Sequence, residues 1–125
     1  MEEKVYFETS DGLKLCGILM HPKIKTFTCI VLCHGITADK NEYGNVFKKL
    51  AQNLKDNGFS VFRFDFRGHG ESQGKSVDMT ISGETKDIKA AVNFLKSKGF
   101  KKFGMVSASF AGGAPSYYIS ENPNT

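Results

Sequence analysis

Cysteine is scarce in this sequence, and its arrangement excludes a disulfide framework. There are three cysteines, an odd number, and no Cys-x-x-Cys pair. Cys29 and Cys33 lie in an apolar run, where a thiol is an ordinary core residue. Neither the cysteines nor the histidines have the spacing of metal ligands. We therefore expect reduced thiols, a cytoplasmic setting, and no metal or other cofactor.

Long apolar runs and strong charge of one sign are also missing. No run approaches the roughly 20 apolar residues of a membrane-spanning helix, and the Met-Glu-Glu-Lys start lacks the apolar core of a signal peptide. Lysine and arginine number 17 against 13 acidic residues, and the lysines are scattered rather than gathered in a stripe with aromatics. We expect neither a membrane nor a nucleic acid as partner.

The sequence has no internal repeat and no low-complexity segment. Hydrophobic residues make up 40% of the chain, charged residues 24%, and there are 11 phenylalanines, enough for a sizeable core. This composition is typical of a globular protein. The 125 residues fit one small domain, residues 1–125.

Apolar runs and helical periodicities alternate along the chain. The apolar runs predict strands at Val5–Phe7, Leu13–Met20, Thr28–Cys33, Phe59–Asp65 and Lys102–Ser107. Apolar residues at helical spacing predict helices at Tyr43–Asp56, from Ser82 or Gly83 to just before Gly99, and from Ser109 to about Ser120.

This alternation indicates an α/β fold. The Asp-Gly turn between the first two strands predicts a β-hairpin, and the later strands, separated by helices, predict a parallel sheet. Active sites in such sheets gather at the carboxyl ends of the strands. The loops that carry His34, Asp65 and Ser109 all follow strands, so we expect them at that end.

The segment around Ser109 has the pattern of a nucleophile elbow. An apolar strand ends there and a helix is predicted to follow, a turn that exposes the serine hydroxyl and needs small residues two positions away on each side. Ser107 and Ala111 occupy those positions instead of the usual glycines. Ser107 is a poorer nucleophile candidate, because Met105 would then stand where a small residue is needed. A Ser/Ala/Gly helix start that only packs closely is the alternative.

A His-Gly turn follows the buried strand that ends at Cys33. After His34 and Gly35, the next backbone amide can face a developing oxyanion. We assign the two oxyanion donors to the backbone amides of Ile36 and Phe110. Cys33 as a thiol nucleophile is an alternative, but its place in a buried strand favours a core cysteine.

The segment from Asp65 to Ser72 is the most specific in the chain. A strand delivers Asp65, and Gly68 and Gly70 make a tight turn rich in backbone polar groups. The residues predict a structural loop beside the site, in which Arg67 and His69 make local hydrogen bonds. His69 as a catalytic base is the sharper alternative.

Together these segments resemble the α/β-hydrolase superfamily, nearest to cinnamoyl or feruloyl esterases and to serine aminopeptidase-like (S33) proteins. The His34 turn, the Asp65–Ser72 loop, a helix with acidic Glu84 and Asp87 in its first turns, and the serine elbow occur in the family's order. The resemblance implies a serine hydrolase of acyl esters with Ser109 as nucleophile, Ile36 and Phe110 as oxyanion donors, and a small acyl compound as substrate.

The same resemblance implies that part of the protein is missing. In this family an acid and then a histidine follow the serine, but only Glu121 and no histidine follow Ser109. We expect the N-terminal half of an α/β-hydrolase domain, cut off after the elbow helix and inactive alone. The last strand would then present an open edge, so we also expect self-association.

Two other functions remain open at this stage. A non-catalytic binding module on the same fold agrees with the missing triad residues and the replaced glycines. A nucleotide-binding domain agrees with glycine-rich turns after strands, but no Gly-x-Gly-x-x-Gly opens the first helix and no phosphate-binding loop motif exists.

Overall fold

The computed structural model describes residues 2–34, 39–41, 45–75 and 80–107. Five strands and two helices follow one another along the chain. They are β1 (Glu2–Glu8), β2 (Lys14–Met20), β3 (Thr28–Cys33), α1 (Val46–Asp56), β4 (Ser60–Phe64), α2 (Ile81–Ser97) and β5 (Lys102–Ser107).

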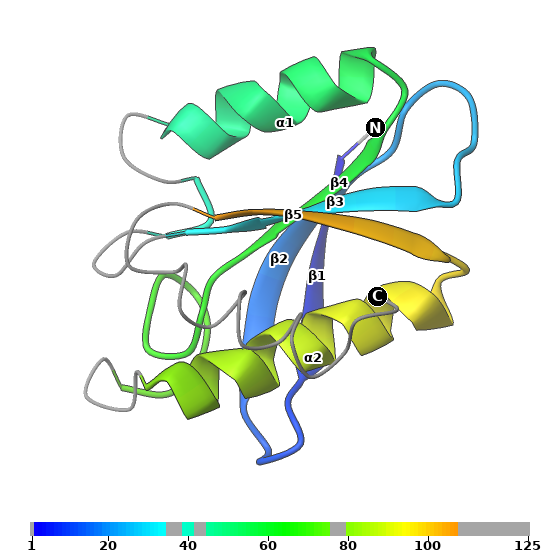
Figure 1. Ribbon diagram of the computed structural model, residues 1–125. Coiled ribbons are helices and arrows are strands. Elements are labelled where there is room, and N and C mark those ends of the chain that lie inside the picture. The colour runs from blue at the N-terminus through cyan, green and yellow to red at the C-terminus, as the bar shows by residue number, and fades with distance from the viewer. Residues whose placement is uncertain (1, 35–38, 42–44, 76–79, 108–125) are drawn as a thin grey trace.

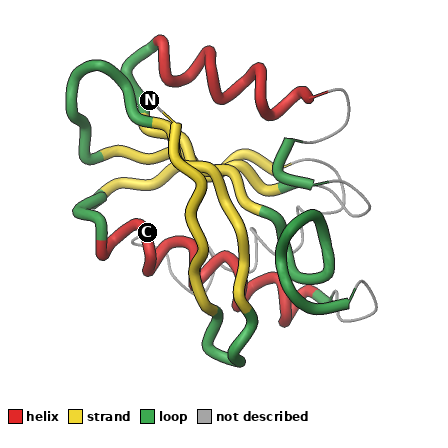
Figure 2. Tube along the Cα trace, turned by 180° about the vertical axis from the view of Figure 1, so that it is seen from behind, coloured by secondary structure: helices red, strands yellow, loops and turns green. Residues whose placement is uncertain are grey.

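The strands form one mixed sheet in the order β1-β2-β4-β3-β5. The β1–β2 hairpin lies at one edge and pairs antiparallel with β4 through β2, whereas β3 pairs parallel with both β4 and β5. Helix α1 covers one face of the sheet and α2 the other (Figure 1). Figure 2 shows the same three layers from behind, with the hairpin projecting beyond the helices.

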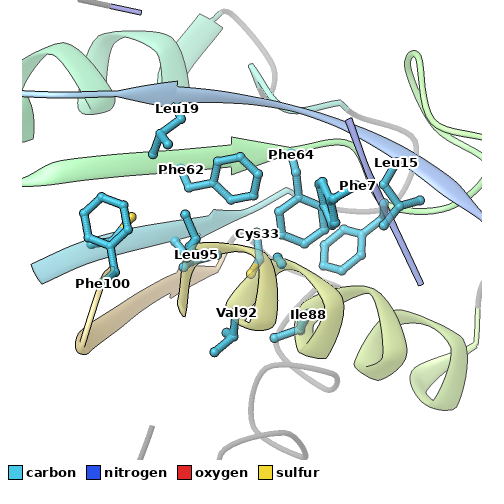
Figure 3. Close-up of a cluster of buried hydrophobic side chains, with 14 residues drawn as sticks. Phe7, Leu15, Leu19, Cys33, Phe62, Phe64, Ile88, Val92, Leu95 and Phe100 are labelled. Carbon is cyan, nitrogen blue, oxygen red and sulfur yellow. The ribbon is translucent and has the colours of Figure 1, made fainter. Parts of the chain in front are cut away.

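The larger core lies between the sheet and α2. Ile88, Val92 and Leu95 recur at helical spacing and are fully buried, as the periodicity predicted. They face a group of phenylalanine rings on the sheet (Figure 3). Phe7 of β1 lies 5.6 Å from the ring of Phe62, measured between ring centroids, and thereby ties the edge hairpin to the centre of the sheet.

The core on the α1 side is smaller. Phe47 and Ala51 of α1 are buried against Leu32 of β3 and Val61 of β4, while Leu50 is only partly buried. The central strands β3 and β4 are thus covered on both faces, which explains why β3 is apolar without alternation and why every residue of β4, including Arg63, is buried.

All five predicted strands are present, but β1 spans Glu2–Glu8 and not only Val5–Phe7, and the helix starts also differ. The strands at Thr28–Cys33 and Lys102–Ser107 have the predicted bounds, and α2 begins at Ile81, slightly before the predicted start. Helix α1 begins at Val46 rather than at Tyr43, which lies outside the described residues, as does the helix predicted after Ser109. No described helix is long and apolar enough to cross a bilayer.

Candidate active site

Three strands bring their carboxyl ends together at one end of the sheet. In the parallel ladders, Cys33 at the end of β3 aligns with Phe64 of β4 and with Ser107 of β5. Residues that follow these three positions in the sequence therefore leave the sheet side by side. His34 and Asp65 lie at this end, as the sequence predicted.

His34 joins the ends of β3 and β4. Its side chain is fully buried, and its Nε2 accepts a hydrogen bond of 3.0 Å from the backbone N–H of Phe66. The ring also packs edge-on against the Phe66 ring, 5.1 Å between centroids. Because Nε2 is an acceptor here, the neutral tautomer carries its proton on Nδ1. His34 is a positioning residue for the backbone that follows β3.

Asp65 is the centre of a buried polar cluster. Its Oδ1 accepts from the backbone N–H of Lys40 at 2.7 Å, and its Oδ2 accepts from the Lys40 ammonium at 2.8 Å and from the backbone N–H of Glu71 at 3.0 Å. Burial alone would lower the pKa of Lys40, but the hydrogen bond and charge of Asp65 raise it, so the ammonium keeps its charge although it is buried. Asp65 is thereby committed to structure and holds Lys40 beside the end of β4.

Two glycines let the loop after β4 close around this carboxylate. Gly70 has φ +50°, and a Cβ atom built there would lie within 2.5 Å of both carboxylate oxygens of Asp65. Gly68 has φ +75°, and its N–H donates to the carbonyl of Gln73 at 2.9 Å. The glycines are therefore needed for the conformation and for the close approach, which confirms the predicted tight turn.

Arg67 connects this loop to two distant elements. Its guanidinium makes a bidentate contact with Asp11 in the β1–β2 turn, at 2.8 and 3.0 Å, and its Nε donates to Asp87 of α2 at 3.0 Å. These hydrogen bonds hold the pKa of Asp11 well below its usual range. Asp87 is fully buried and pairs with Arg67.

Glu84 is a second buried acid in the first turn of α2. Its side chain is 5% exposed, and no described group donates a hydrogen bond to its Oε2. Burial, with the nearby charge of Asp87, raises the pKa of Glu84 to about 7. The helix start therefore holds a carboxyl that changes charge near neutral pH.

The two alternative catalytic groups in this region are both structural. Cys33 is fully buried, and burial raises the pKa of its thiol to about 12, so it is a core cysteine rather than a nucleophile. The ring Nδ1 of His69 lies 3.0 Å from the carbonyl oxygen of Arg67, and the backbone N–H of His69 donates to the carbonyl of Phe66. These contacts are the local hydrogen bonds predicted for His69. The local hydrogen bonds predicted for Arg67 are not what its side chain makes, since it binds Asp11 and Asp87, which are distant in sequence.

The structure does not describe the residues of the predicted catalytic chemistry itself. Gly35, Ile36, Ser109 and Phe110 lie outside the described residues, so the nucleophile and the oxyanion donors stay predictions. Within the described part of the chain, no group of three or more His, Cys, Asp or Glu side chains could hold a metal ion.

Sequence reasoning missed the partners of the loop residues. Lys40 lies 25 residues before Asp65, and Asp11 lies 56 residues before Arg67. No local pattern marks such pairs, since their spacing reflects the fold and not a helix or strand period. Only the presence of a charged residue inside an otherwise tight turn hinted that Arg67 needed a partner.

Comparison with known proteins agrees with this architecture. The chain superposes on an esterase of Pyrococcus furiosus, Pf2001, with a TM-score of 0.87 and 26% identity, over 99% of this chain and 48% of that one. It superposes on Est1E of Butyrivibrio proteoclasticus, solved with ferulic acid bound, with a TM-score of 0.84 and 26% identity, over 95% and 48% of the two chains.

A curated relative gives the same picture from sequence. Over 102 residues the chain is 35% identical to the thiohydrolase aneE of Aspergillus aculeatus, covering 78% of this chain and 31% of that protein. The chain thus spans about a third of that relative and about half of the solved esterases. Residues 25–125 match the serine aminopeptidase (S33) family. The chain therefore belongs to this family and has the N-terminal part of an α/β-hydrolase fold.

Proposed function

We propose that this chain is the front half of a serine hydrolase that cleaves acyl esters through an acyl-enzyme on Ser109. The observation that carries the proposal is the alignment of Cys33 with Ser107 in the β3–β5 ladder. Because of this alignment, the His34 turn and the segment that leads to Ser109 both leave the sheet from neighbouring positions on adjacent strands. The family match, which covers both segments, supports the same assignment.

In this proposal the Ser109 Oγ attacks the acyl carbonyl carbon while a general base removes its proton. The backbone amides of Ile36 and Phe110 donate hydrogen bonds to the carbonyl oxygen as it becomes an oxyanion. The alcohol leaves with a proton from the protonated base, and water then hydrolyses the acyl-enzyme. The base and its orienting acid would come from residues beyond this sequence, in the family's order of serine, acid and histidine.

Described residues anchor both ends of the segment that carries Ile36, the proposed oxyanion donor. His34, just before that segment, is bonded to the backbone of Phe66, and Lys40, just after it, is bonded twice to Asp65. Both ends of the stretch that carries Ile36 are therefore anchored to the loop after β4. Such anchoring matters because hydrogen-bond donors stabilise the transition state best when they do not have to reorient during the reaction.

The test uses the full-length protein that carries these 125 residues and a p-nitrophenyl acyl ester. Ser109→Ala should lower kcat by at least about 10³-fold, since the nucleophile is lost. Ser107→Ala, which removes the neighbouring hydroxyl, should keep most of the activity. A fluorophosphonate should label Ser109, as located by mass spectrometry of the digested protein.

A binding module without catalysis is the competing function, and the residues Ser107 and Ala111 in place of glycines favour it. Full turnover by the Ser109→Ala protein, or no fluorophosphonate adduct on Ser109 in the wild type, would overturn the hydrolase proposal. The second result would support the binding module.

A further inference from the structure

A cavity of about 330 Å³ lies at the opposite end of the sheet from His34 and Asp65. It opens between the β2–β3 loop, which carries Lys25 and Phe27, and the turn from α2 to β5, which carries Lys98. In Figure 1 these two connections face each other across the amino ends of β3 and β5. The volume is at the small end of the range of ligand pockets in proteins.

The described residues that line the cavity carry positive charge only. They include three lysines, Lys23, Lys25 and Lys98, and no acidic residue. Outside the lining, Glu3 is engaged by the ring of His21 at 3.2 Å, and Asp56 borders a neighbouring hollow beside Lys23. A lining with cationic side chains and no acidic one favours an anion. The Lys98 Nζ lies 5.6 Å from the ring centroid of Phe94, outside the lining, and would turn from that ring toward a bound anion.

An exposed aromatic ring, Phe27, lines the cavity between the ammonium groups of Lys25 and of Lys101, which lies outside the lining. Phe27 is 52% exposed, and the Nζ atoms of Lys25 and Lys101 lie 5.6 and 5.3 Å from its ring centroid. The lining also includes His21, stacked on Phe100 with an angle of 12° between the rings. Exposed and stacked rings of this kind favour a ligand with a flat apolar group.

A buried hydroxyl without a partner completes the site. Ser60, the first residue of β4, lines the cavity and is 1% exposed, and no described group forms a hydrogen bond with its Oγ. Buried polar atoms are nearly always paired, because an unpaired one keeps the full cost of leaving water. A rotation of this short side chain would let its hydroxyl donate to a ligand oxygen.

We propose that this cavity binds a phosphate monoester that carries a flat ring. The phosphate, a dianion at neutral pH, would lie among Lys23, Lys25 and Lys98 and accept a hydrogen bond from Ser60, while the ring packs on Phe27. Lysine ammonium groups suit phosphate as point charges that need no planar fork. This site is independent of the proposed hydrolase chemistry at the other end of the sheet.

The experiment is a titration of the full chain with phenyl phosphate at pH 7.5, followed by isothermal calorimetry and by amide shifts of Phe27, Ser60 and Gly99. Saturable binding is expected, with benzoate weaker because it has one charge and benzyl alcohol weaker still. Lys25→Gln and Lys98→Gln should each weaken binding about threefold. Ser60→Ala should weaken it about fivefold and leave the folded chain at least as stable.

Lys49→Gln is the matched control, because it removes the same charge from α1 on the other face of the sheet. Its affinity should equal that of the wild type. Three results would overturn the proposal: no saturable binding of phenyl phosphate, equal binding of benzyl alcohol, or an equal loss in Lys49→Gln and Lys98→Gln. The last result would mean attraction to the net positive charge of the chain and not to this cavity.

Discussion

The carboxylate of Asp65 leaves no room for a side chain at Gly70, and this close contact can be tested. In Gly70→Ala the new methyl group would overlap the Asp65 oxygens, and the residue would keep a left-handed backbone. Strain and overpacking together should lower the free energy of unfolding by about 2–4 kcal/mol. Urea denaturation followed by circular dichroism measures this loss.

Gly58→Ala separates the two contributions. Gly58 also has a positive φ, +93°, but a Cβ there meets nothing within 4 Å. Its loss should be about 1 kcal/mol, from backbone strain alone. Equal losses in the two variants would show that the contact with Asp65 does not matter.

Glu84 should make the stability of the chain depend on pH near neutrality. Burial raises its folded pKa from 4.5 to about 7, so the folded chain holds the proton more tightly than the unfolded chain does. The resulting stability is fully present below pH 4.5 and is lost as the pH rises through 7. The loss should amount to about 3 kcal/mol for a shift of this size.

Glu84→Gln removes this titration and keeps the shape of the side chain. The stability of the wild type relative to this variant should fall as the pH is raised from 4.5 to 8, by urea denaturation at each pH. Glu8→Gln, at an exposed position of β1, should track the wild type across the same range. A constant difference between wild type and Glu84→Gln would contradict a raised pKa of Glu84.

At the scale of elements, α2 depends on a cap that α1 lacks. The N–H of Gly83 donates to the Thr80 hydroxyl at 2.9 Å, whereas Asn45 before α1 makes no capping hydrogen bond through its side chain. Thr80→Ala should therefore lower the free energy of unfolding by about 1 kcal/mol. Thr80→Ser keeps the hydroxyl and should lose much less. Thermal unfolding of both variants makes the comparison, and equal losses would argue against the cap.

The strands were easier to predict than the helix starts. Thr28–Cys33 is apolar because α1 and α2 cover both of its faces, so its bounds are marked in the sequence itself. The start of α2 depends on one hydrogen bond of Thr80, which precedes the first apolar position of the helix. Asn45 has φ +57°, a backbone choice that its residue type allows but does not require.

The candidate site was predictable in its place but not in its contacts. Strand endings put His34 and Asp65 at one end of the sheet, because parallel strands share a direction. The pairs Lys40–Asp65 and Arg67–Asp87 bring together elements that are distant in sequence, and these pairs exist only once the fold is formed. The same holds for the cavity around Ser60, whose lysines come from separate loops.

At the scale of the whole molecule, the two edge strands of the sheet, β1 and β5, differ in how readily they could pair with another chain. On the hairpin side, β1 is an edge strand too and pairs with β2 alone within the described residues, but it carries the charged residues Glu2, Glu3, Lys4 and Glu8, which oppose pairing with another chain. On the other side, β5 pairs with β3 alone within the described residues. An edge strand with unpaired backbone groups is a template for pairing with another chain.

We therefore expect the isolated 125-residue chain to self-associate through β5. Val106, which is 38% exposed on this strand, is the position to change, because a charged side chain on an edge strand opposes pairing. Val106→Lys should raise the monomer fraction in size-exclusion chromatography with light scattering. Val46→Lys, the same change at an exposed position of α1, should leave the distribution unchanged. A wild-type chain that is monodisperse, monomeric and cooperatively melting would mean that β5 is not an open edge in solution.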